Sequence, residues 1–592
     1  MKQYREVIWV FFCFLFLIAM GLVINDKQDG GLHLAYLKNE QRHVAHPAIS
    51  TLILYDGQDP LAQEAGRHYK QILADMRYGY DMLDFRKQAS FPNLSKYQRL
   101  VILLSSTDPL DSERYQIEAW LREGGQVLFG LALDQDESTE KWFPLLGVAS
   151  AKPGHHLVKS FYPAKAFMLG GGHTYSLPDP FRSSWQVSLE PSSKAHMWSD
   201  QAGNLPLVWE HPFGKGRVVV DNIGFYEKSN RGFHASAFSL LGSVTVFPVI
   251  NGKTYVIDDF PAPLPQGTSP YLRMKIPDFY RLVWWPDILA VGRKWDLHYT
   301  GAAIENYGDQ TKGDFHYRRE KRPFGSSLLD AGGEIALHGF NHQPLSLDRS
   351  WYEQRYPAYR DWFSSKTMKD SLTNLIGATR YWDERSQPSV YVPPSNVLSQ
   401  EGRDVLATIP TIRTVAASYF PGDAAYEQEF GWAEDGLVDA PRTVSGYAWD
   451  AYNRLTVLSE LNLHFVHHQF FHPDDLLDPD RGARLGWKKL KDSFEEDLEE
   501  LQKWAPQLRS LRASELGAAI QRYSNLSVVE RKVDGGISLK LDGFVDQAYL
   551  MVRLHSGRIK GAQGGEVWAL REGGYLLKAT SSDIFLEIGE KE

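Results

Sequence analysis

Short, mainly apolar runs that alternate with helix-like segments constrain the fold of this 592-residue chain most strongly. Residues 51–55 and 100–104 are such runs, residues 125–129 and 216–220 continue the series, and residues 112–123 have a helical period. Apolar runs of this length are typical of strands that are buried on both faces, as in parallel sheets covered by helices. We therefore predict an open α/β sheet for the first part of the chain.

This first region resembles glutamine-amidotransferase-like domains in the order of its strands and helices. The only cysteine of the chain is Cys13, so the region has no cysteine nucleophile. The resemblance therefore implies an architecture and not an activity. Residues from about 150 to 213 are richer in Gly, Pro, Ser and His, and we interpret them as an insertion of short strands within this domain.

The N-terminus carries an apolar run at residues 7–24, with Lys2 and Arg5 before it and Asp26 after it. The length and the flanking charges predict a transmembrane helix with a cytoplasmic start, and hence a single-pass cell-membrane protein whose remaining part is extracytoplasmic. A cleaved signal peptide has the same features and stays open as the alternative. No small-x-small cleavage site follows Ile24, which favours retention.

The chain is longer than one domain with a single hydrophobic core usually is, and the order of its predicted strands and helices divides it into four segments. They are a cytoplasmic start with the membrane anchor (1–28), the open α/β domain (29–245), a distorted (β/α) barrel (246–523) and a small C-terminal β-sandwich (524–592). The fold class is thus α/β multidomain. The formal net charge is −9, so the chain has no excess of Lys and Arg with which to bind phosphates, and we expect no nucleic-acid partner.

The barrel segment opens with an apolar strand at residues 254–257 that ends in Asp258 and Asp259. In such barrels the functional groups lie at the C-terminal ends of the strands. Adjacent residues on a strand point to opposite sides, so one carboxylate can bind a metal while the other stays free as a base. A simple turn is the competing interpretation of two aspartates before a proline.

A second strand, at residues 333–337, ends in His338, and His342 follows four positions later. Two imidazoles around one turn can bind a single divalent cation such as zinc, nickel, cobalt or iron. With Asp259 they would form a three-ligand face that leaves positions open for water and substrate. A histidine pair on a helix surface is the alternative.

A histidine-rich stretch at residues 463–475 supplies the third group. If it is a regular strand, its period of two places His464, His468 and His472 on one face. His472 lies where that strand should end, and imidazole is suited to protonating an amine leaving group near neutral pH. A second metal cluster or a hydrogen-bonded core is the alternative interpretation.

Over residues 250–480 these three motifs resemble those of polysaccharide deacetylases of the NodB-homology type, a carbohydrate esterase superfamily. Within it, the stretches around Asp259, His342 and His472 are most similar to deacetylases of the Pel exopolysaccharide system. The resemblance implies N-deacetylation of an acetylated amino-sugar polymer, of N-acetylgalactosamine or N-acetylglucosamine, with release of acetate during biofilm matrix maturation. It also implies other exopolysaccharide synthesis and export proteins as partners.

The resemblance further implies a role for each motif residue. Asp258 would be the general base, and Asp259, His338 and His342 the ligands of one divalent metal, Zn²⁺ first, with Ni²⁺, Co²⁺ or Fe²⁺ as alternatives. His472 would be the general acid, with His468 as the alternative on the same strand.

The third motif of the superfamily normally begins with arginine and ends in Pro-Tyr, and residues 391–396 lack that arginine. We expect Pro394 and Ser395 next to the oxyanion, because a backbone N–H can stabilise it without a particular side chain. Arg442 is our candidate to replace the missing arginine in space.

Two other functions stay open. A glycoside hydrolase could use Asp258 with Asp474 or Asp475, but it would leave the paired histidines without a role. A catalytically silent carbohydrate-binding scaffold would explain the altered third motif.

Overall fold

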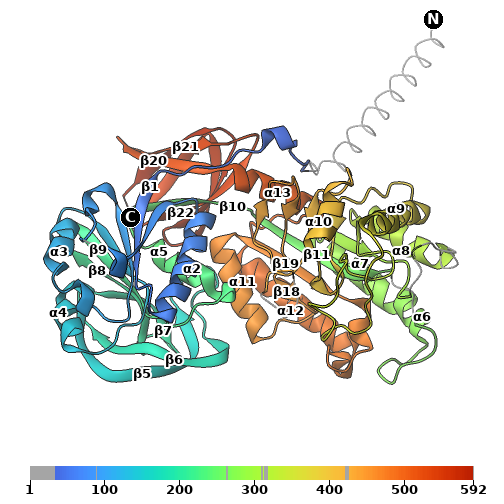
Figure 1. The fold of residues 1–592 in the computed structure, drawn as a ribbon, viewed down its shortest axis with the longest axis horizontal. Helices are drawn as coiled ribbons and strands as arrows, with labels where there is room; N and C mark the ends of the chain where they lie inside the picture. The colour runs from blue at the N-terminus through green and yellow to red at the C-terminus, as the bar shows by residue number, and fades with distance from the viewer. Residues whose placement is uncertain are drawn as a thin grey trace, which may run out of the picture.

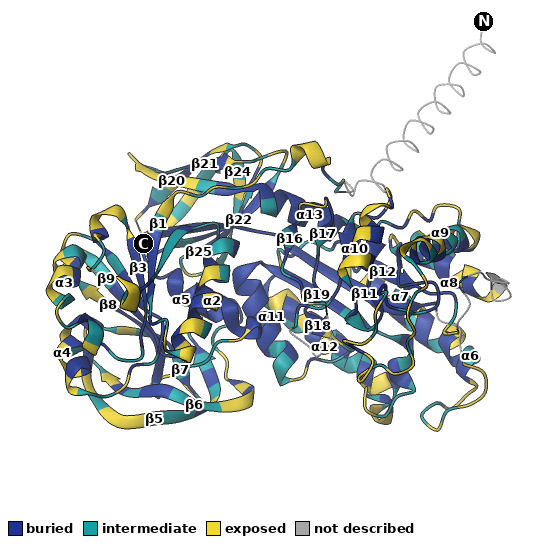
Figure 2. Ribbon diagram, in the orientation of Figure 1, coloured by how far each residue is buried: buried dark blue, intermediate teal, exposed yellow. Residues whose placement is uncertain are grey.

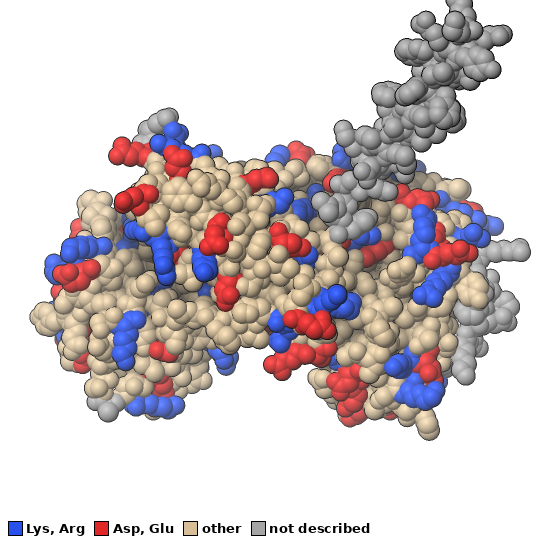
Figure 3. All heavy atoms as spheres, turned by 90° about the horizontal axis from the view of Figure 1, so that it is seen from above, with Lys and Arg blue, Asp and Glu red and all other residues tan. Residues whose placement is uncertain are grey.

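The computed structural model describes residues 34–88, 90–261, 265–308, 311, 318–420 and 426–590. These residues form three parts, each built on β-sheets (Figure 1). The first part, blue to cyan, and the second, green to orange, lie at opposite ends of the molecule, and the red strands of the third lie along one side (Figure 1). Basic and acidic side chains are interspersed over the face seen in Figure 3.

The first part is one nine-stranded sheet whose two halves differ in direction. Its parallel half pairs β2 with β1, β1 with β3, β3 with β4 and β4 with β9. Strands β8, β7, β5 and β6 extend the same sheet in antiparallel fashion, so residues 148–213 continue the sheet. The strands are β1 (Ile49–Tyr55), β2 (Gly79–Asp84), β3 (Arg99–Leu103), β4 (Gln126–Phe129), β5 (Val148–Pro163), β6 (Tyr175–Leu189), β7 (Lys194–Ser199), β8 (Pro206–Phe213) and β9 (Gly216–Asp221); the helices are α2 (Pro60–Asp75), α3 (Arg114–Arg122), α4 (Glu137–Leu146) and α5 (Arg231–Phe238).

The second part is also one nine-stranded sheet, in the order β16-β17-β15-β14-β13-β12-β11-β19-β18. Every neighbouring pair is parallel except β16 with β17. The strands are β11 (Gly252–Phe260), β12 (Tyr299–Ala303), β13 (Glu334–Leu337), β14 (Val390–Tyr391), β15 (Thr414–Val415), β16 (Gly431–Trp432), β17 (Val438–Asp439), β18 (Val444–Ser445) and β19 (Val466–Phe471). All residues of β11 and β12 are buried, as their apolar sequence requires (Figure 2).

Helices of the second part lie around its sheet, and several of them carry exposed residues on their outer side (Figure 2). They are α6 (Ile276–Phe279), which runs through a π-helical turn (Tyr280–Trp284) into α7 (Trp285–Trp295), then α8 (Arg318–Asp330), α9 (Ser365–Trp382), α10 (Gln400–Ala407), α11 (Ala451–Leu463), α12 (Trp487–Trp504) and α13 (Ala513–Asn525).

The third part packs two four-stranded antiparallel sheets on a shared apolar core. One sheet has the order β20-β21-β26-β23, and the other has the order β10-β22-β25-β24. Strand β10 (Val244–Val249) comes from the linker between the first two parts, so the third part is not purely C-terminal. The other strands are β20 (Ser527–Val533), β21 (Gly536–Asp542), β22 (Ala548–Leu554), β23 (Arg558–Gln563), β24 (Gly565–Arg571), β25 (Gly574–Ala579) and β26 (Asp583–Gly589).

The predicted fold class is wrong in the form stated above, and the structure corrects it in three respects. Among the described residues, no helix is both long and apolar enough to cross a bilayer. The longest of them, α9 and α12, have 18 residues each and carry charges along one face. The predicted transmembrane segment at residues 7–24 lies outside the described residues.

The second and third corrections concern the barrel and the sandwich. The expected (β/α) barrel is an open sheet resembling half a barrel, because its end strands β16 and β18 do not pair with each other. Strands β14 to β18 have only two residues each, which leaves too few backbone hydrogen bonds to close a barrel. The expected C-terminal sandwich recruits β10 because β22 would otherwise be an unpaired edge.

Charged side chains are buried where the first part meets the second. Arg231 at the start of α5 donates to Glu429 at 2.7 Å, and Lys228 forms an ion pair with the same carboxylate at 3.2 Å. His464, which caps α11, lies 3.6 Å from Asp75 at the end of α2. These pairs join the first two parts through charge as well as through apolar packing.

Candidate metal centre

Side chains at the C-terminal ends of β11, β13, β14 and β19 meet in one cavity of about 470 Å³. The end of β11 is irregular: its register against β12 shifts between Ile257 and Phe260, which inserts one extra residue. Asp259 has a left-handed backbone with φ of 55°. A bulge of this kind redirects side chains, and both Asp258 and Asp259 line the cavity although they are neighbours on a strand.

Asp259, His338 and His342 form a three-residue cluster, and one donor atom from each lies within 4.8 Å of the others. Oδ1 of Asp259 is 3.6 Å from Nε2 of His338 and 3.4 Å from Nε2 of His342. The turn between the histidines needs Gly339, whose φ is 80°, and His342 itself has φ of 55°. Among the described residues, no other group of His, Cys, Asp and Glu meets this spacing.

The hydrogen bonds around the cluster suit a bound cation. Nδ1 of His338 donates to the carbonyl of Val392 at 2.8 Å, which leaves the lone pair of its Nε2 for a metal. Burial lowers the pKa of His338 and of His342 to about 4, so both rings are neutral, as metal ligands must be. Burial also raises the pKa of Asp259, and its buried Oδ1 has no hydrogen-bond partner. A divalent cation would satisfy that oxygen.

Asp258 has a different partner. Arg442 donates from Nη1 to its Oδ2 and from Nη2 to Oδ1 of Asn396, both at 2.5 Å. Burial alone would raise the pKa of Asp258, but the charge of Arg442 opposes it, and the pKa lies below its usual value. The guanidinium also stacks over Phe470, 4.0 Å from the ring centroid. Arg442 therefore holds an ionised carboxylate in place; its contacts are with Asp258 and Asn396.

His472 follows the last residue of β19 and lies between two carboxylates. Its Nε2 is 3.7 Å from Oδ2 of Asp258, and its Nδ1 is 3.5 Å from Oδ1 of Asp475. Burial alone would lower the pKa of His472, but the Asp475 hydrogen bond and the charge of Asp258 raise it to about 9. Arg481 in turn contacts Asp475 at 2.9 Å. A protonated imidazole beside the cluster can serve as a proton donor.

The remaining candidates lie at different distances from the cavity. Ser395 lines it, whereas Pro394 is buried behind it in the turn. His468 is fully buried on β19, with Nδ1 3.2 Å from the carbonyl of Pro441, and is not among the cavity-lining residues. The predicted strand face that included His464 does not form, because His464 ends helix α11 and β19 begins at Val466.

Two tyrosines at the cavity were missed by sequence reasoning. Tyr359 places its hydroxyl 3.0 Å from Nδ1 of His342 and 2.6 Å from the hydroxyl of Ser395. Tyr307 lines the cavity, with its ring 5.7 Å from that of His342. Both come from irregular loops, so no strand or helix period pointed to them. The density of aromatic residues between 351 and 363 was the available signal.

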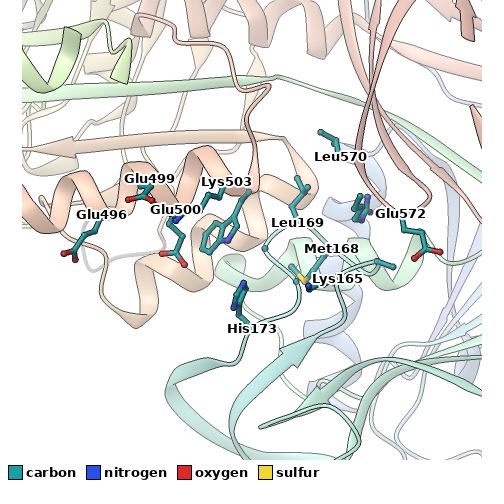
Figure 4. A pocket seen from close by; sticks show the side chains of 15 residues that line it. Lys165, Met168, Leu169, His173, Glu496, Glu499, Glu500, Lys503, Leu570 and Glu572 are labelled. Atoms are coloured by element: carbon teal, nitrogen blue, oxygen red, sulfur yellow. Dashed lines mark ion pairs between the residues drawn. The ribbon is translucent and has the colours of Figure 1, made fainter. Parts of the chain in front are cut away.

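A larger cavity of about 710 Å³ lies elsewhere, where α12 meets the first and third parts. Figure 4 shows Glu496, Glu499 and Glu500 on one side of it, with Leu570 and Glu572 on the other. Acidic and basic side chains are mixed along its walls. It contains no cluster with metal-ligand spacing among the described residues, so the smaller cavity is the better candidate for chemistry.

Comparisons with known proteins place the chain in a family but indicate no activity for it. The family described as "Uncharacterised protein conserved in bacteria (DUF2194)" matches residues 159–576, more than half of the chain. No curated protein matches.

Three similar solved structures are all distant from this chain. A β-galactosidase from Rahnella sp. R3 has 16% identity and a TM-score of 0.26, covering 34% of this chain and 34% of its own. A ThuA-like protein from Bacteroides uniformis ATCC 8492 has 16% identity and a TM-score of 0.23, covering 32% and 85%. Puue allantoinase has 10% identity and a TM-score of 0.31, covering 46% and 90%. The chain spans about a third of the length of the β-galactosidase, and similarities this weak carry no functional argument.

Proposed function

We propose that this chain, which belongs to the bacterial family DUF2194, is a metal-dependent hydrolase that removes acetyl groups from the amino sugars of a polysaccharide. The convergence of Asp259, His338 and His342, with Asp258 beside them, is the observation that carries the proposal. Three protein ligands leave open positions for substrate and water, as hydrolytic metal sites require. The substrate class comes from the resemblance of the motifs to NodB-type deacetylases, and the finer proposal is a Pel-like exopolysaccharide.

The residues present fit one divalent cation, with Zn²⁺ as the first choice for two imidazoles and one carboxylate. When bound, such an ion supplies a Lewis acid for the carbonyl oxygen and for the attacking water. Asp258 is ionised and lies next to the ligand Asp259, so it accepts a proton from the water as the water oxygen attacks the acetyl carbon.

The second proton transfer belongs to His472. As the C–N bond breaks, the leaving nitrogen takes a proton from the imidazolium, and the products are acetate and a free amine on the sugar. The raised pKa of His472 keeps it protonated at neutral pH, while the lowered pKa of Asp258 keeps that group ionised. One reaction that uses both a general base and a general acid needs the base ionised and the acid protonated at the same pH, and Asp258 and His472 meet this requirement.

The glycoside hydrolase alternative has less support. Asp474 and Asp475 both form ion pairs with Arg481 at 2.9 Å, and Asp475 also contacts His472. Asp474 lines the same cavity as Asp258, but its ion pair with Arg481 holds it there, and a glycosidase mechanism would leave His338 and His342 without a role.

A single assay tests the proposal. The purified protein, stripped with a chelator and reloaded with Zn²⁺, is incubated with oligomers of N-acetylgalactosamine or N-acetylglucosamine, and both acetate and chain length are measured. We expect acetate release that needs the metal and leaves the chain length unchanged. Shortened chains would favour the glycosidase, and an inactive protein with every divalent metal would favour a scaffold.

A further inference from the structure

The hydroxyl of Tyr359 connects the metal cluster to a second residue that lines the cavity, Ser395. Its hydroxyl lies 3.0 Å from Nδ1 of His342 and 2.6 Å from the hydroxyl of Ser395. Nε2 of His342 is the atom that faces Asp259. The three side chains therefore form a chain from the ligand His342, through Tyr359, to a hydroxyl that lines the cavity.

The direction of these hydrogen bonds depends on what His342 binds. A neutral imidazole that gives the lone pair of Nε2 to a metal must carry its proton on Nδ1. That N–H then donates to the oxygen of Tyr359, and the tyrosine O–H is free to donate to Ser395. The oxygen of Ser395 is thereby occupied as an acceptor, and its own proton is left to point into the cavity.

The backbone at Ser395 is an independent observation. Ser395 has φ of 51° and ψ of 22° in a turn closed by Asn396 N–H to Pro393 O at 3.0 Å. This left-handed conformation favours glycine or asparagine, and it costs a serine conformational energy. The same conformation brings the serine side chain to both Tyr359 and the cavity.

We propose that the Ser395 hydroxyl donates a hydrogen bond to the carbonyl oxygen of the acetyl group, in a direction set by metal-bound His342 through Tyr359. The inference rests on the proposed function. It makes Ser395 a catalytic residue that touches the substrate and Tyr359 a positioning residue that acts through it. Metal binding would therefore prepare both the Lewis acid and a matching side-chain donor for the negative charge that develops on the oxygen.

The test compares Ser395→Gly, Tyr359→Phe and the double variant, with Tyr115→Phe on the exposed surface of α3 as the tyrosine control. Ser395→Gly removes the hydroxyl while it relieves the left-handed backbone, so its melting temperature should be no lower than that of the wild type. We expect its kcat to fall about 100-fold, the usual effect of losing one oxyanion donor. Tyr359→Phe should lower kcat as well, and the double variant should lose no more than Ser395→Gly alone.

A binding measurement separates this inference from the proposed function. Acetate affinity is measured by calorimetry on the Zn²⁺-loaded and the metal-free proteins. We expect loaded wild type to bind acetate more tightly than loaded Ser395→Gly or Tyr359→Phe, with Tyr115→Phe equal to the wild type and no difference among the metal-free proteins. Equal acetate affinity in all loaded variants, or independent losses that multiply in the double variant, overturns the proposal. If no acetylated substrate is cleaved but the acetate pattern holds, the proposed function fails and the hydrogen-bond chain stands.

Discussion

The guanidinium of Arg442 donates a hydrogen bond to Asp258 at 2.5 Å, although 184 residues separate the two along the chain. Both side chains are almost fully buried, so the pair is shielded from water and salt. Arg442 reaches Asp258 from the segment between β17 and β18, whereas Asp258 lies near the end of β11, so the pair forms only when these distant segments come together in the folded sheet.

Replacing Arg442 by methionine should move the acidic limb of the pH–rate profile to higher pH. Without the guanidinium of Arg442, burial raises the pKa of Asp258. At a given acidic pH, a larger fraction of the enzyme then has Asp258 protonated and unable to act as a base. We expect a loss of about 100-fold in kcat/KM at pH 7, within the usual range for general base catalysis.

Arg442→Lys keeps the positive charge, so its acidic limb should lie between those of the wild type and Arg442→Met. Arg531→Met, at an exposed position of β20, is the control and should leave the limb unmoved. Breaking a buried ion pair costs about 3–5 kcal/mol of stability, so the unfolding free energy is measured in parallel. An unmoved limb in a folded Arg442→Met protein would show that Arg442 does not tune Asp258.

Much of this site was visible in the sequence, and the missing pieces have physical reasons. Asp258 and Asp259 lie at the end of apolar strand β11, His338 directly follows apolar strand β13, and the ends of parallel strands meet at one edge of a sheet. The left-handed backbone at Asp259 was not foreseeable, because non-glycine residues rarely adopt it.

Other features depend on tertiary contacts that leave no periodic signal. Helix α11 is buried on nearly every side, so it has no apolar stripe, and its last residue, Leu463, and its C-cap, His464, were wrongly predicted to belong to a histidine-rich strand. The sheet stays open because five of its strands have only two residues each. The apolar runs in the sequence suggest longer strands than those that form. Tyr359 comes from a loop whose path only the folded structure defines.

His472→Gln should abolish proton donation without weakening metal binding. The pKa of His472 is raised to about 9, so the wild type should lose activity as the pH rises through about 9, and the variant should lack this limb. For an N-acetyl sugar we expect a loss of about 100-fold or more in kcat. An aryl acetate ester, whose leaving group needs no proton, should be cleaved almost as fast by the variant as by the wild type. Equal losses on both substrates would exclude His472 as the general acid.

Removing one ligand should remove the metal. His342→Ala is the better choice of the two histidines, because its side chain is 19% exposed and leaves less of a buried hole than His338→Ala. We expect bound zinc to fall from one equivalent per chain to almost none, measured by elemental analysis after dialysis. His173→Ala, at the exposed wall of the larger cavity, is the matched control and should keep its zinc. Zinc retained by His342→Ala would contradict the assigned ligand set.

Metal binding should also stabilise the fold. A ligand present at 100 times its dissociation constant adds about 2.7 kcal/mol to the free energy of unfolding, provided that it binds only the folded state. Chelation should therefore lower the melting temperature of the wild type, and reloading with Zn²⁺ should restore it. His342→Ala should melt at the same temperature with and without chelator. A wild type that is indifferent to chelation would mean that the cluster holds no metal under those conditions.

The junction of the first and second parts should weaken at alkaline pH. Burial alone would lower the pKa of His464, but Glu460, which contacts its Nδ1 at 2.7 Å, and Asp75 raise it to about 9. Since the folded pKa lies above the usual 6.5, the stabilising effect is complete below pH 6.5 and is lost as the pH rises through about 9. The change is on the order of 3 kcal/mol when titration is complete. Urea unfolding between pH 6 and 10 should show this loss in the wild type and a flatter profile in His464→Gln. An equally steep decline in both proteins would place the alkaline transition elsewhere in the fold.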